Sequence, residues 1–121
     1  MYHLIELLRK SNIVSRLDIL HFVDEEDIQV FSAKATLSDS SFLYIRELTT
    51  KAEAKYSYHW QTNAGKLICR WDNAPHHRSI ETFPHHKHKE NDENVLSSKE
   101  VTLEQVFNII DKQLKEEKKK K

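Results

Sequence analysis

Two stretches of alternating polar and apolar residues, separated by the only glycine in the chain, constrain the fold most strongly. Residues 54–61 place a large aromatic side chain at every second position, and residues 66–71 continue the alternation. A period of two is typical of β-strands that have one face in a hydrophobic core. Gly65 closes the short connection between the stretches, where a hairpin turn requires a positive φ. The sequence therefore predicts an antiparallel hairpin, with its aromatic residues filling the core: Tyr56, Tyr58 and Trp60.

The rest of the chain adds three earlier strands and a helix near each end. We expect a helix at 2–8 and strands at 13–23, 29–37 and 42–48. The last helix starts at Thr102, which forms a capping box with Gln105, and its apolar stripe comprises Leu103, Val106, Phe107, Ile110 and Leu114. These elements predict an α+β fold: an antiparallel sheet of about five strands, with a short N-terminal helix and a C-terminal helix packed on it.

Length and composition narrow the class of protein. With 121 residues, the chain predicts a single α+β domain at 1–118 and a disordered lysine tail at 119–121. No apolar run approaches the roughly 20 residues of a membrane-spanning helix. The only cysteine, Cys69, excludes an internal disulfide, favours a cytoplasmic setting and lies where a strand residue packs in the core. Nucleotide-cofactor folds are disfavoured because the chain has no glycine-rich phosphate loop.

Histidines are concentrated in one part of the chain. Six of the eight lie within residues 59–88, namely His59, His76, His77, His85, His86 and His88. Arg46, Arg70 and Arg78 lie in or close to the same segment. Histidine exchanges protons near neutral pH, and arginine presents two parallel N–H donors to phosphate. Cleavage of RNA by its own 2′-hydroxyl needs a base, an acid and a cation, so this composition favours metal-independent RNA cleavage.

Three other interpretations of the segment stay open. His86 and His88 share one side of an extended chain, so with His59 or His76 they are candidate ligands of a metal-dependent nuclease. The same groups, with Trp71 stacking on an unpaired base, suit binding of RNA or protein without chemistry. The histidines can also serve only to satisfy neighbouring backbone groups. A net charge of zero argues against nucleic-acid binding by bulk charge alone, although residues 51–89 are locally basic.

Three motifs carry a resemblance to a known family. YSYHWQ at 56–61, RWDNAPHH at 70–77 and FPHHKH at 83–88, with Arg46-Glu47 before them, resemble the TumE family of toxins from prokaryotic toxin–antitoxin systems. The resemblance implies a cytoplasmic toxin of a type II system, neutralised by a cognate antitoxin that is usually a helix-turn-helix DNA-binding protein. It also implies site positions at His59, Arg70, Asp72, Asn73, His76, His77, His85, His86 and His88. Ribonuclease activity follows only by analogy with other small α+β toxins.

The sequence thus predicts an endoribonuclease that acts on RNA without a metal or other cofactor and without a membrane, and it leaves a homodimer open. The residues expected to carry catalysis are His59, Arg70, His76, His77, His86 and His88. The residues expected to contact substrate are Arg46, Trp71, Asn73, Arg78 and His85, and those expected to orient catalytic groups are Glu47 and Asp72. This hypothesis requires imidazole rings from distant parts of the chain to converge beside a guanidinium in one solvent-reachable cleft.

Overall fold

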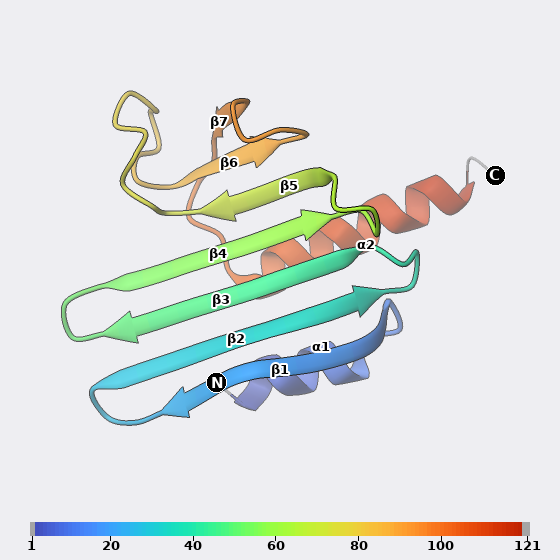
Figure 1. Cartoon of the computed structure of the whole chain (residues 1–121), viewed down its shortest axis with the longest axis horizontal. Helices are drawn as coiled ribbons and strands as arrows, with labels where there is room; N and C mark the ends of the chain where they lie inside the picture. Colours follow the sequence, from blue (N-terminus) through green and yellow to red (C-terminus); the bar gives the residue numbers. More distant parts are fainter. Residues whose placement is uncertain (1, 120–121) are drawn as a thin grey trace.

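The computed structural model describes residues 2–119, apart from the side chain of residue 118, and these residues form one antiparallel sheet and two helices (Figure 1). In chain order the elements are α1 (Tyr2–Lys10), β1 (Val14–Asp24), β2 (Ile28–Leu37), β3 (Phe42–Thr50), β4 (Ala54–Gln61), β5 (Leu67–Asp72), β6 (His86–Lys89), β7 (Val95–Ser97) and α2 (Leu103–Lys119). Each strand pairs with the next one in the chain, so the sheet order is β1 to β7. The expected α+β class is confirmed.

The hydrophobic core lies between the sheet and the two helices, which cover the same face (Figure 1). The apolar stripe expected on α2 is buried along its whole length, at Leu103, Val106, Phe107, Ile110 and Leu114. Opposite it, Tyr58, Trp60 and Cys69 are buried in the sheet, as their alternation predicted. Burial of each large apolar side chain stabilises by roughly 1.5–3 kcal/mol, so this stripe holds α2 on the sheet.

Local signals in the sequence account for the turns and the helix start. Gly65 has a φ of +92° in the connection between β4 and β5, and its N–H donates to the carbonyl of Thr62 at 2.9 Å. The capping box forms as expected: the Thr102 N–H donates to Oε1 of Gln105 at 2.9 Å, and the Gln105 N–H donates to Oγ1 of Thr102 at 3.2 Å. The pairing of β1 with β2 shifts register between Ile19 and His21, and such a bulge puts consecutive residues of a strand out of phase.

The strand count differs from the expected number of about five, since two further strands follow β5. The segment 73–98, in which the sequence predicts no strand, contains β6 and β7, of four and three residues. The sequence HKHK of β6 has no apolar alternation that could have marked it as a strand. Of the expected lysine tail at 119–121, Lys119 ends α2, and residues 120–121 lie outside the described residues.

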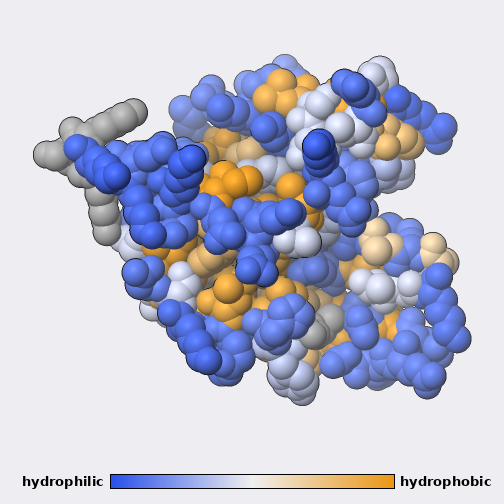
Figure 2. Space-filling model, turned by 180° about the vertical axis from the view of Figure 1, so that it is seen from behind, coloured by the Kyte–Doolittle hydropathy of each residue, from blue (hydrophilic) through white to orange (hydrophobic). Residues whose placement is uncertain are grey.

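The surface on the helix side is mainly hydrophilic. Figure 2 views this side and shows hydrophilic side chains over most of it, with hydrophobic residues visible in patches between them. Within residues 2–119, neither helix combines the length and the apolar character that crossing a membrane requires.

Candidate functional site

The pairing of the strands places polar residues in two rows across the face of the sheet opposite the helices, which we call the helix-free face. One row contains Arg46, Ser57, Asp72 and His86, and the other contains His59, Arg70 and His88. Side chains alternate between the two faces of a strand, and the neighbours Tyr58 and Trp71 are buried on the helix side. Both rows therefore project from the helix-free face, where residues distant in sequence come together.

The carboxylate of Asp72, at the end of β5, links three segments on this face. Its Oδ1 lies 2.9 Å from Nε2 of His86 and accepts the backbone N–H of Ala74 at 3.0 Å. Its Oδ2 accepts Nε–H of Arg70 at 3.2 Å and lies 3.5 Å from Nε2 of His88. The Asp72 side chain is only 10% exposed. Asp72 thus ties β5 to β6 and to the start of the loop at 73–85.

His86 and His88 are buried, and both ring nitrogens of each face a partner. Nδ1 of His86 lies 2.9 Å from the carbonyl oxygen of Pro84, and Nδ1 of His88 lies 2.8 Å from that of Asp92. A carbonyl only accepts, so each Nδ1 carries a proton and donates it. Both Nε2 atoms point toward Asp72. Burial lowers the pKa of His88. Neither ring has a nitrogen left to exchange a proton directly with a substrate.

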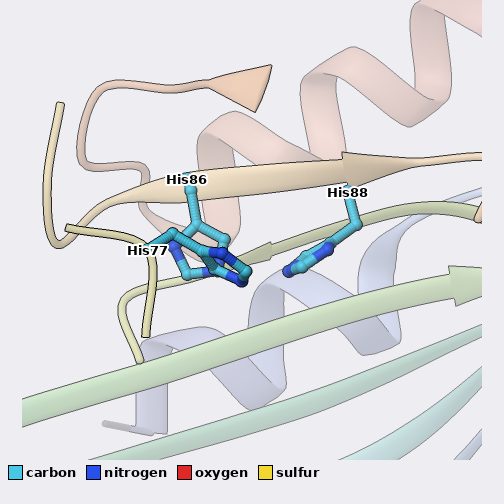
Figure 3. Close-up of side chains that lie close together, drawn as sticks. All are labelled: His77, His86 and His88. Carbon is cyan, nitrogen blue, oxygen red and sulfur yellow. The ribbon is translucent and has the colours of Figure 1, made fainter. Parts of the chain in front are cut away.

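His77 completes a cluster of three imidazoles. It comes from the loop, whereas His86 and His88 project from β6, and the three rings point toward one another (Figure 3). The ring of His77 meets the other two edge-on, with centroid distances of 4.8 Å to His86 and 5.5 Å to His88. One ring nitrogen from each of the three lies within 4.8 Å of the other two. This arrangement is compatible with a metal site.

An open pocket of about 710 Å³ lies on the helix-free face beside Asp72. The polar side chains that line it include Arg46, Lys55, Arg70, Asp72 and His76. Three cationic side chains and one carboxylate give this lining a net positive charge, which attracts an anion. The pocket is suited to a phosphate group.

Comparison with known protein families assigns the chain. Residues 4–114 match the family described as Toxin TumE. This match covers almost the whole chain. The chain belongs to the TumE toxin family. No curated protein and no solved structure was found to match it. The family expected from the motifs at 56–61, 70–77 and 83–88 is thereby confirmed.

Three residues predicted for the site project toward the helix side in this TumE-family chain. Trp71 is 4% exposed and packs in the core, so its ring is not available to stack on a base. His85 stacks on Tyr56, and its Nδ1 lies 2.9 Å from the Tyr56 hydroxyl. Glu47 is hydrogen-bonded to Tyr58. Each of these residues directly precedes or follows a residue on the helix-free face. Successive side chains of an extended chain point to opposite faces, so the neighbours lie on opposite sides of the sheet.

Of two further predicted substrate contacts, Asn73 lines the pocket, whereas Arg78 is not among its lining residues. The Asn73 side chain accepts the backbone N–H of Tyr56 at 3.0 Å and donates to the carbonyl of Ala54 at 2.8 Å. Both ends of this amide are therefore used to fix the start of the loop to β4. Arg78 is exposed, and its guanidinium carbon lies 6.0 Å from the ring centre of Phe83.

His59 and His76 are the predicted catalytic histidines outside the buried cluster. His76 is exposed and lines the pocket. His59 is half-buried on the helix-free face, with Nε2 at 3.0 Å from Oε1 of Gln61, and burial lowers its pKa. The neutral, proton-accepting form of His59 is therefore favoured near neutral pH.

Sequence reasoning missed two residues of the site. Lys55 reaches the pocket because it alternates with Tyr56 along β4, a signal that the sequence contained. Asp92 pairs with Nη1 of Arg70 at 3.1 Å, and its backbone carbonyl accepts from His88. It lies in the polar connection between β6 and β7, and no motif marks it.

Replacing Glu47 with glutamine is expected to raise the free energy of unfolding near pH 7. Burial raises the pKa of Glu47, and its Oε2 has no hydrogen-bond partner among the described residues. The folded protein therefore holds this proton to a higher pH than the unfolded chain, so stability from Glu47 is present at low pH and lost as the pH rises through the folded pKa. Urea unfolding between about pH 4 and pH 7 should show a gain that grows with pH. The exposed Glu53→Gln should show no such gain; equal effects of the two variants would contradict the prediction.

Proposed function

We propose that this toxin inhibits growth by binding and cleaving RNA in the pocket of the helix-free face. The observation that carries the proposal is the convergence of Arg46, Arg70 and the exposed His76 on one pocket. Two guanidinium groups supply fixed positive charge for a phosphate, and an imidazole supplies proton exchange. Lys55 extends the positive lining along β4.

The proposed reaction is attack of a ribose 2′-hydroxyl on the adjacent phosphorus. The 2′-oxygen loses its proton and bonds to phosphorus, and the 5′-oxygen of the next nucleotide leaves with a proton, which gives a 2′,3′-cyclic phosphate. Arg46 and Arg70 stabilise the charge that develops on the phosphorus oxygens. His76, the histidine that lines the pocket, exchanges the proton at one of the two oxygens.

The burial of His86 and His88 changes the roles that the sequence suggested for them. Both rings have their nitrogens engaged, so in this proposal they act through Asp72, which holds Arg70 in the pocket. Glu47 and His85, on the helix side, take no part in the proposed reaction.

A toxin family implies a cognate antitoxin as partner. We propose that this antitoxin is a helix-turn-helix DNA-binding protein encoded beside the toxin and that it neutralises the toxin by covering the pocket. Sequencing of the adjacent reading frames tests the first part. Protection of His76 from chemical modification in the complex tests the second.

Replacing His76 with alanine is expected to slow RNA cleavage by about 100-fold or more, the usual contribution of a proton-exchanging side chain. The measurement is incubation of purified protein with end-labelled RNA, with analysis of the product ends. A 2′,3′-cyclic phosphate supports attack by the 2′-hydroxyl. His85→Ala is the matched control, since His85 lies on the helix side and should leave the rate unchanged. Binding of RNA without cleavage by the wild type would replace the proposal with a non-catalytic RNA-binding toxin.

A further inference from the structure

The proposed reaction gives the cluster of His77, His86 and His88 no direct contact with RNA, although two of its rings are almost fully buried. His86 and His88 are 2% and 3% exposed, and the three rings are brought together from β6 and from the loop at 73–85. Buried polar groups need complementary partners, because an unmatched one costs about 1–3 kcal/mol. The groups that face the ring nitrogens of this cluster therefore indicate which kind of ligand would match them.

The two buried histidines present lone pairs toward a carboxylate. Because each Nδ1 donates its proton to a backbone carbonyl, the neutral ring has an unprotonated Nε2. These Nε2 atoms lie 2.9 Å and 3.5 Å from oxygens of Asp72, which also carry lone pairs. Such contacts are repulsive unless a proton on Nε2 or a bound cation lies between them. Donation of the second ring N–H to a backbone carbonyl is also the usual way in which a metal-binding histidine is oriented.

The spacing of the donor atoms suits a small tetrahedral ion. Bonds of about 2.0–2.1 Å to Zn²⁺ place neighbouring ligand atoms about 3.3 Å apart. The two distances from Nε2 to Asp72 bracket this value, and the histidine nitrogens lie within 4.8 Å of one another. Binding of an ion would require the histidine nitrogens to move closer to one another than the 4.8 Å within which they lie here. The lone cysteine, Cys69, is on the helix side of the sheet and adds no competing ligand.

We propose that His77, His86, His88 and Asp72 bind one divalent transition-metal ion of the Zn²⁺ class. Three imidazoles and one carboxylate form a set of four ligands of the nitrogen and oxygen types that Zn²⁺ accepts. The ion joins the loop at 73–85 to β5 and β6, and this loop carries His76 into the pocket wall. The proposal goes beyond the proposed function and does not rest on it, because the ion needs no RNA to bind.

Two histidines of the cluster each have a counterpart outside it, and these pairs supply matched variants. His77 is in the cluster and His76 is exposed beside it; His88 is in the cluster, whereas His85 stacks on Tyr56 on the helix side. The experiment titrates Co²⁺ and Zn²⁺ into full-length protein stripped of metal. It records the visible absorption of tetrahedral Co²⁺, the bound Zn²⁺ by elemental analysis and the melting temperature.

We expect one bound ion and a raised melting temperature for the wild type, His76→Gln and His85→Gln. His77→Gln and His88→Gln should weaken binding by more than the 10–100-fold typical of losing an outer-shell partner. Because His77 is only partly buried, His77→Gln is the variant expected to keep its fold, which circular dichroism checks. Absence of binding by the wild type, or equal binding by all four variants, would overturn the proposal and leave a proton shared between Asp72 and His86.

Discussion

Replacing Asp72 with asparagine is expected to lower the free energy of unfolding of the metal-free protein by about 3–5 kcal/mol, the cost of removing one partner from a buried ion pair. The Asp72 carboxylate is 10% exposed, and the neighbouring Arg70 and His86 side chains are 27% and 3% exposed. Asparagine has nearly the same shape but cannot offset the charge of Arg70. The variant therefore leaves a partly buried guanidinium without its closest carboxylate.

Asp92 provides the matched control for Asp72. It pairs with the same arginine, at 3.1 Å from Nη1, but its side chain is 71% exposed. Exposed ion pairs contribute at most about 1 kcal/mol, so Asp92→Asn should cost no more than that. Urea unfolding in the presence of a chelator measures both variants without a contribution from bound metal. If Asp72→Asn costs no more than Asp92→Asn, Asp72 does not organise the site.

Much of the sheet could be predicted because its strands follow elementary rules. The alternation at 54–61 and 66–71, the glycine between them and the capping box at Thr102 are local features, and each forms as expected. The strands β6 and β7 could not be found in this way. They are short and polar, and they are held by pairing with β5 and by the contact of His77, in the loop at 73–85, with His86 and His88.

The candidate site was only partly predictable, for a reason that lies in the geometry of strands. Arg46 and Glu47 are consecutive, as are Trp71 and Asp72, yet the members of each pair project from opposite faces. Strict use of the alternation rule would have assigned the two members of each pair to opposite faces of the sheet from the sequence alone. The position of His77 was not accessible in this way, because it depends on how the loop at 73–85 folds over β6. The sequence therefore favoured His59 or His76, and not His77, as the third member of a histidine metal site.

Arg46→Ala is expected to reduce RNA cleavage by about 100–1,000-fold while leaving the fold intact, the loss typical of removing one group that stabilises developing charge. Arg46 projects from the middle of β3 into the pocket. The ion pairs within the described residues use Arg16 and Arg70 but not Arg46, so its guanidinium is not committed to holding the structure. Its removal should therefore affect the bound phosphate more than the free energy of unfolding.

The chain offers two comparisons that make the Arg46 experiment decisive. Arg46→Lys keeps the charge but loses the paired N–H donors, so it should restore only part of the rate if both donors contact the phosphate. Arg16→Ala removes an exposed arginine that pairs with Asp18 on the edge strand β1, and it should leave cleavage unchanged. The measurement is the rate of cleavage of end-labelled RNA, with urea unfolding of each variant alongside. Cleavage by Arg46→Ala at the wild-type rate would mean that the phosphate does not bind between Arg46 and Arg70, and the assignment of this pocket to RNA would have to be abandoned.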